Sequence, residues 1–83
     1  MSRQSPSNRS PVRIGEAARH ADVSRQTVEY YIHVGLIEPI RRSGSRSRYF
    51  DDELIRRIRL IRQLNDTGMP LREIRRTYRH RWR

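Results

Sequence analysis

The chain of 83 residues contains no cysteine. Disulfide bonds, thiolate catalysis and metal sites held by cysteine are therefore excluded. The three histidines, His20, His33 and His80, are far apart in the sequence and have none of the spacings typical of metal ligands. We therefore expect neither a metal site nor a cofactor.

Long apolar runs are also missing from the sequence. No stretch approaches the roughly 20 apolar residues that a membrane-spanning helix requires. Residues 1–11, MSRQSPSNRSP, have no apolar core behind their charges, which a secretory signal needs. The sequence thus predicts a cytoplasmic protein without a membrane partner.

Sets of catalytic side chains are absent as well. There is no glycine-rich phosphate loop, no pairing of Ser or Cys with His and Asp, and no pair of carboxylates at a catalytic spacing. The acidic cluster Asp51-Asp52-Glu53 stands where a helix is expected to begin, and acidic residues stabilise that end of a helix. We interpret the cluster as a helix cap and predict that the protein is not an enzyme.

Positive charge is what the chain has in excess. Basic residues number 19 against 9 acidic ones, which gives a formal net charge of +10. All of the basic residues are arginine, since lysine is absent. Such an excess attracts polyanions, and arginine can grip a phosphate or the major-groove edge of guanine. The charge therefore indicates a nucleic-acid partner, although GC-rich codon usage explains the choice of arginine over lysine equally well.

Composition divides the chain near residue 11. Residues 1–11 are rich in Ser, Pro, Asn and Arg without a hydrophobic pattern, so we expect a disordered basic arm. Residues 12–83 are expected to form one small domain with a limited core. Its first parts are predicted to be an extended segment at Val12–Ile14, a helix from Gly15 to about His20, and a turn at Asp22-Val23 with Val23 buried.

A second helix is predicted to begin at Ser24, a favourable N-cap, and to run to about Val34. Val28 and Ile32, four residues apart, form its inward stripe, and Tyr31 lies at the border of that stripe. Arg25 and Glu29 are also four apart, a spacing at which opposite charges pair on a helix surface.

A hairpin should follow this helix. Gly35 ends the helix in the left-handed conformation, and Pro39 prevents its continuation. Ile40–Arg42 and Arg48–Phe50 can pair as two short strands around the polar loop SGSRS.

Two more helices are expected after the hairpin. The first is capped by its acidic start and runs to Gly68, with Arg56, Arg59 and Arg62 on a solvated face. Pro70 suits the first turn of the second. The apolar stripe of that last helix consists of Leu71, Ile74, Tyr78 and Trp82.

This order of parts resembles the N-terminal DNA-binding domain of the MerR family of bacterial transcription regulators. Four blocks carry the resemblance between Val12 and Tyr78: IGEAARHADVSRQTVEYY, GLIEPIRR, RYF followed by an acidic cap, and TGMPLREI. The family fold implies a mainly α-helical winged helix-turn-helix with four helices and a small antiparallel hairpin as the wing. The resemblance places the helix at residues 24–34 in the major groove and the wing at residues 40–50 on the DNA backbone.

The resemblance also implies roles for single residues. Arg25, Thr27 and the residue at position 29 face base edges or nearby phosphates, one of Tyr30 and Tyr31 contacts a phosphate, and the wing arginines position the domain. Thr27 could instead only satisfy the helix backbone, and Tyr31 could belong to the core. The candidate DNA-binding residues are Ser24, Arg25, Gln26, Thr27, Glu29, Tyr30, Tyr31, Arg41, Arg42, Arg46 and Arg48.

Three features depart from the family pattern. Glu29 stands where the family usually has arginine, and we favour a pair with Arg25 over direct reading of cytosine N4. The wing lacks the usual Gly-Tyr before its arginine, and Arg46 could compensate. The sequence also stops before the long dimerisation helix and sensor domain of the family. We therefore expect a short form without a small-molecule effector, which self-associates weakly or cooperates as copies on DNA.

The leading functional hypothesis is a sequence-specific regulator of transcription that binds duplex DNA at the nucleoid. One alternative is a phage or plasmid excisionase-like factor, which bends DNA with a similar small winged helix. A second alternative is a basic RNA-binding protein, although the sequence contains no recognisable RNA motif or aromatic stacking platform.

Overall fold

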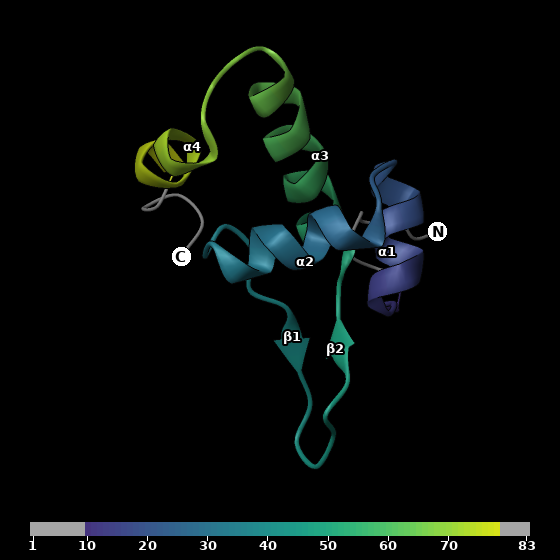
Figure 1. Ribbon diagram of the computed structural model, residues 1–83. Helices are drawn as coiled ribbons and strands as arrows, with labels where there is room; N and C mark the ends of the chain where they lie inside the picture. Colours follow the sequence, from purple (N-terminus) through teal and green to yellow (C-terminus); the bar gives the residue numbers. More distant parts are fainter. Residues whose placement is uncertain (1–9, 79–83) are drawn as a thin grey trace, which may run out of the picture.

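The computed structural model describes residues 10–78 of the chain. This part folds into four α-helices and one two-stranded antiparallel sheet (Figure 1). In chain order the elements are α1 (Ile14–Ala21), α2 (Arg25–His33), β1 (Ile40–Arg41), β2 (Arg48–Tyr49), α3 (Asp52–Asp66) and α4 (Leu71–Tyr78). None of these helices is long and apolar enough to span a membrane. Trp82 and nearly all of the predicted N-terminal arm lie outside the described residues.

Side-chain caps determine where α2 and α3 begin. The Ser24 hydroxyl accepts a hydrogen bond from the Thr27 backbone N–H at 3.0 Å. The Asp51 carboxylate accepts one from the Leu54 backbone N–H at 2.9 Å. A cap of this kind stabilises a helix by about 1 kcal/mol. Both helix starts agree with the prediction from the sequence.

Two arginines of α3 hold the turn between α1 and α2. Asp22 has a left-handed backbone with a φ of 61°, and its N–H returns to the last turn of α1. Arg59 donates a hydrogen bond to the carbonyl oxygen of His20 at 3.1 Å, and Arg62 donates one to that of Asp22. Arg59 and Arg62 are exposed, as predicted for a solvated face, and both also reach across to the end of α1.

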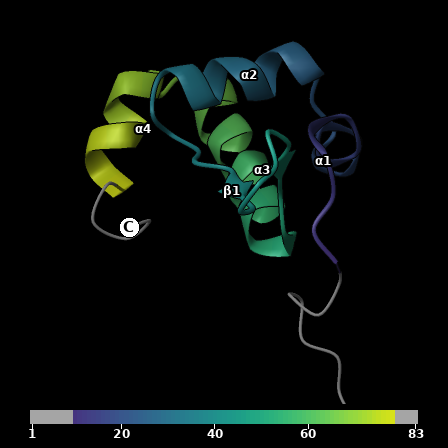
Figure 2. The ribbon, with the colours of Figure 1, turned by 90° about the horizontal axis from the view of Figure 1, so that it is seen from below.

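The core lies between α3 and the other three helices. Figure 2 shows α2 crossing over α3, with α1 and α4 on either side. The largest fully buried side chains come from α2, α3, α4 and the residue after the hairpin: Val28, Phe50, Ile58, Ile61 and Ile74. The contribution of α4 to this set shows that the last helix completes the core and does not merely lie beside it.

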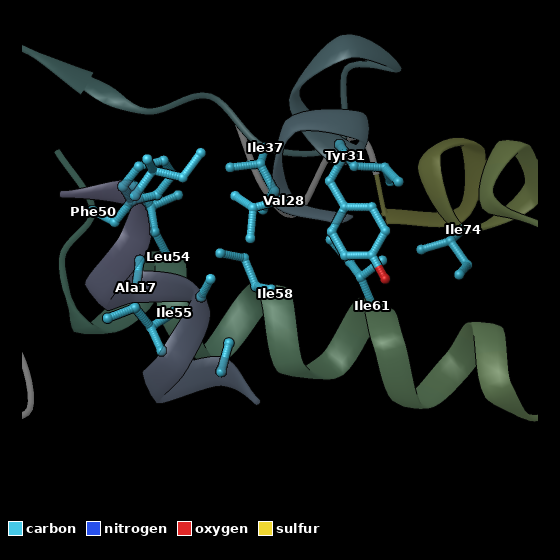
Figure 3. Packing of buried hydrophobic residues seen from close by; sticks show 14 residues of the cluster. Ala17, Val28, Tyr31, Ile37, Phe50, Leu54, Ile55, Ile58, Ile61 and Ile74 are labelled. Atoms are coloured by element: carbon cyan, nitrogen blue, oxygen red, sulfur yellow. The ribbon is translucent and has the colours of Figure 1, made fainter. Parts of the chain in front are cut away.

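The inward face of α2 differs from the predicted stripe. Tyr31 is buried beside Ile61, as Figure 3 shows, with only 4% of its surface exposed. Ile32 is partly buried, and so is Val23 in the preceding turn. The helix thus faces the core with residues three apart, Val28 and Tyr31, because it crosses α3 and is flanked by α4 on that side.

The hairpin is shorter than the sequence suggested. β1 and β2 pair at two positions, one of which places Arg41 opposite Arg48. Phe50 leaves the hairpin and forms an isolated bridge with Val12, with N···O distances of 3.0 and 2.7 Å. The predicted extended segment before α1 therefore anchors the base of the hairpin, which projects away from the helices (Figure 1).

The end of α2 lies against α4. Gly35 has a φ of 85°, as its predicted role at the helix end requires. The side chain of Arg75 crosses this glycine so closely that a Cβ at position 35 would lie 3.0 Å from the Arg75 Nε. The left-handed backbone therefore favours glycine here, and an added Cβ would also force the exposed Arg75 side chain to shift.

Candidate nucleic-acid interface

The first turn of α2 presents polar side chains to solvent. Ser24, Arg25 and Gln26 are exposed, and Thr27 is half-buried. The Thr27 hydroxyl lies 2.9 Å from the Ser24 Oγ, so the two hydroxyls are hydrogen-bonded to each other at the cap. The side chains of Arg25 and Gln26 form no hydrogen bond with the rest of residues 10–78. The two side chains best placed to reach a ligand from α2 are therefore Arg25 and Gln26.

The adjacent tyrosines of α2 have opposite environments. Tyr30 is 53% exposed, whereas Tyr31 is in the core. Burial raises the pKa of the Tyr31 hydroxyl above its usual value, so this side chain stays neutral. The sequence left open whether Tyr31 is a surface residue or a core residue, and its burial places it in the core. Tyr30 remains as the tyrosine that can contact a partner.

The hairpin supplies a group of exposed arginines beside α2. Arg41, Arg42 and Arg46 are exposed, and the residues from 40 to 50 include no acidic side chain. The Arg42 guanidinium lies 4.4 Å from the centroid of the Tyr49 ring, which orients it by a cation–π contact. The hairpin therefore combines unpaired positive charge with one pre-oriented arginine.

Reasoning from the sequence missed two residues beside these arginines, Arg13 and Tyr49. The Arg13 guanidinium lies 6.0 Å from the centroid of the Tyr49 ring, so the ring has an arginine from two separate segments near it. Hydrogen bonding by Ser47, and then by Arg13, lowers the pKa of the Tyr49 hydroxyl. Alternation along β2 could have indicated Tyr49, since it must face away from Arg48. No local pattern in the sequence indicates Arg13, because it lies beside the hairpin only as a result of the bridge between its neighbour Val12 and Phe50.

A bidentate ion pair joins α2 to the hairpin. The Arg48 guanidinium donates two hydrogen bonds to the Glu29 carboxylate, from Nη1 to Oε1 at 3.0 Å and from Nη2 to Oε2 at 2.9 Å. The hydrogen bond from Arg48 lowers the pKa of the Glu29 carboxyl, and the charge of Arg25 lowers it further. The same hydrogen bond raises the pKa of Arg48. The pair is thus fully charged near neutral pH.

This ion pair corrects one prediction about the interface and bears on a second. Glu29 pairs with Arg48 of the hairpin and not with Arg25, which acts on it only through its charge. Arg48, in turn, was predicted to serve as a wing arginine in contact with DNA, and two of its guanidinium nitrogens are already hydrogen-bonded to Glu29. The sequence spacing of four residues favoured Arg25, but β2 brings Arg48 closer.

An open depression of about 940 Å³ lies where α2 faces the C-terminal end of α3 and the start of α4. Three acidic residues line it: Glu29, and also Asp22 and Asp66, which lie 3.9 and 3.4 Å from the guanidinium of Arg62. This flank of α2, to which Gln26 and Tyr30 also belong, has mixed charge, whereas the hairpin has an excess of arginine. Electrostatics therefore favour a polyanion at the outer face of α2 and the hairpin.

Comparisons with known proteins agree with this arrangement. The sequence matches the family of MerR HTH regulatory proteins over residues 12–80. It is 41% identical over 64 residues to the nodulation protein NolA of Bradyrhizobium sp. (strain NC92), covering 77% of this chain and 27% of NolA. It is 36% identical over 61 residues to the HTH-type transcriptional regulator HmrR of Sinorhizobium medicae, covering 74% of this chain and 42% of HmrR.

A solved structure is similar over most of the described fold. The transcription regulator PbrR691 from Ralstonia metallidurans CH34, crystallised in complex with lead(II), superimposes with a TM-score of 0.76 at 36% identity. The match covers 84% of this chain and 55% of PbrR691, so the chain spans little more than half the length of that regulator and less of the other two. The chain thus has the predicted winged helix-turn-helix fold and belongs to the MerR family of helix-turn-helix regulatory proteins.

Proposed function

We propose that this domain binds duplex DNA at specific sequences and thereby regulates transcription. The observation that carries the proposal is the arrangement of α2 beside the hairpin. A helix capped at Ser24 holds the exposed Arg25 and Gln26 outward, and a wing with three exposed arginines stands next to it. An α-helix fits the major groove, and basic side chains beside it bind the phosphates.

The interface residues divide into two groups by the chemistry they offer. Arg25 and Gln26 lie in the first turn of α2, where side chains reach base edges, and both types form bidentate contacts with purines. Arg41, Arg42 and Arg46 of the wing hold phosphates and position the domain. Tyr30, exposed on α2, donates its hydroxyl to a phosphate. Arg13 adds to the phosphate grip, since it faces the wing through Tyr49.

Two copies of the domain are proposed to act together. One winged helix covers only a single half-site, and a second copy on an adjacent half-site raises the affinity by raising the local concentration. We propose that the copies cooperate in this way on DNA of the bacterial nucleoid, in the cytoplasm.

A selection from random duplexes tests the proposal directly. The full chain is used to enrich bound sequences, and the winning duplex is then titrated to measure how many copies bind. We expect one enriched motif and two protomers per site. A structured RNA of equal length, compared at the same salt concentration, is the control. Equal affinity for the RNA and for the selected duplex would refute sequence-specific DNA binding.

A further inference from the structure

The pair between Glu29 and Arg48 connects the two elements that are proposed to contact DNA. Glu29 is the single acidic side chain of α2, and the wing, residues 40–50, has none. The two partners are 19 residues apart in the sequence. Their side chains are 43% and 25% exposed, so the pair lies at the surface between α2 and β2.

The geometry of the pair matters more than its energy. Ion pairs at this exposure contribute little to stability, because water and salt screen them. A bidentate contact, however, aligns the planar guanidinium with the carboxylate and so fixes the relative orientation of the two segments. The hairpin needs such a fixed point, since β1 and β2 pair at only two positions. Short two-stranded hairpins are marginally stable by themselves.

The pair also changes which charges are available to DNA. Arg41 lies directly opposite Arg48 in the hairpin, and like charges in that position repel each other. Glu29 neutralises Arg48 and removes part of that repulsion. Both carboxylate oxygens of Glu29 and two amino groups of Arg48 are engaged. Arg48 keeps three further N–H donors, but Glu29 neutralises its charge and so weakens its attraction for phosphates. Glu29, for its part, does not repel phosphates as a free carboxylate would.

We propose that Glu29 is a positioning residue that locks the wing to the reading helix and withholds Arg48 from the DNA backbone. This inference rests on the proposed function. The consequence is a gain in sequence discrimination, because the wing meets the backbone in one orientation and one arginine less binds phosphate without regard to sequence.

The test compares Glu29→Ala with Glu38→Ala. Each substitution raises the net charge by one, but Glu38 is exposed outside any helix and forms no ion pair with residues 10–78. Affinity is measured on the selected duplex and on a scrambled duplex of equal composition, at several salt concentrations. We expect Glu29→Ala to tighten binding to the scrambled duplex roughly 5- to 10-fold near 0.1 M salt and to steepen the log–log salt slope by about 0.9. In Glu29→Ala, the specificity ratio, which is the affinity for the selected duplex divided by that for the scrambled duplex, should fall. Glu38→Ala leaves that ratio and the slope unchanged.

Two substitutions of Arg48 separate geometry from charge. Arg48→Lys keeps the positive charge but not the bidentate contact, so we expect it to lower the specificity ratio without flattening the salt slope. Arg48→Ala leaves Glu29 as a free carboxylate beside the phosphates and weakens binding to both duplexes. A double variant that carries both Glu29→Ala and Arg48→Ala has no free carboxylate at this place. The loss of affinity is therefore largely relieved in it, and the effects of the two alanine substitutions are not additive. Circular dichroism melts confirm that each variant is folded.

Several results would overturn the proposal while leaving DNA binding itself intact. Additive effects in the double variant would show that Glu29 and Arg48 act independently. A change of preference at one base pair in Glu29→Ala, with Arg48→Lys unaffected, would show that Glu29 reads a base directly. A flatter slope in Arg48→Ala with an unchanged specificity ratio would make Arg48 an ordinary phosphate contact. Failure of the unmodified chain to bind any duplex would instead refute the proposed function, and the positioning role with it.

Discussion

Raising the salt concentration should weaken DNA binding by an amount that follows from the arginines of the interface. Four arginines that are proposed to hold phosphates, Arg13, Arg41, Arg42 and Arg46, are exposed and form no ion pair with residues 10–78, whereas Arg48 is bound to Glu29. If each of the four neutralises one phosphate, log Kd should rise with log salt with a slope of about 3.6, which is 0.9 for each phosphate. Affinity should then fall roughly 150-fold when salt rises from about 50 to about 200 mM.

Fluorescence anisotropy with a labelled selected duplex measures this slope. Arg46→Ala removes one wing arginine and should lower the slope by about 0.9. Arg56→Ala is the matched control, because it removes the same charge from an exposed position of α3. Arg56 lies on the side of α3 opposite its buried residues and therefore faces away from α2, which crosses the buried side (Figure 2).

The reasoning has a clear point of failure in these measurements. A slope below about 2 would mean that fewer than half of the expected phosphate contacts exist. If Arg56→Ala lowered the slope as much as Arg46→Ala does, the electrostatic contribution would come from net charge alone. The wing would then have no special part in binding.

Three further predictions concern reading, stability and pH. Arg25→Ala should relax the preference at one base pair, at a cost of about 1–3 kcal/mol on the selected site, and a uniform loss on all sequences in the duplex selection would contradict a base contact. Gly35→Ala should destabilise the domain in urea unfolding by about 1–2 kcal/mol for the left-handed backbone, and by slightly more because the Arg75 side chain must shift away from the new Cβ, which would lie 3.0 Å from its Nε. Gly44→Ala, with a φ of 76° and no atom within 4 Å of the added Cβ, carries the backbone cost alone, and an equal or larger loss there would contradict the role of Arg75. Because the pKa of the Glu29 carboxyl is lowered in the folded state, its pair with Arg48 stabilises the fold above the ordinary carboxyl range and is lost as pH falls through that lowered value. Thermal melts between about pH 6 and pH 3 should therefore show a slightly smaller loss of stability for Glu29→Gln than for the unmodified chain, and a larger loss for Glu29→Gln would contradict the pairing.

Much of the fold could be predicted because its signals are local. The caps at Ser24 and Asp51 and the left-handed Gly35 act within one turn of the chain, so their sequence neighbourhood is sufficient to identify them. The same holds for the outward position of Arg25, which follows directly from the start of the helix. The order of these signals, together with the motifs, also indicated the correct family.

The inward face of α2 could not be predicted in the same way. Val28 can share the inward face of α2 either with Tyr31, three residues later, or with Ile32, four residues later. Both spacings place two side chains on the same side of a helix. The choice depends on the angle at which α2 crosses α3 and on the position of α4. Neither is a local property, and the structure places Tyr31 in the core.

The sequence by itself determined the positive charge, the helix boundaries and the presence of a wing, because composition, capping and turn chemistry act over a few residues. Only the tertiary structure decided which charged groups remain free for the proposed contact with DNA. Arg59 and Arg62 reach the end of α1 from positions 39 and 40 residues away, and Arg48 reaches Glu29 across 19 residues. Long arginine side chains pair with the acceptor that is nearest in space, and that acceptor is known only when the helices and the hairpin have packed together.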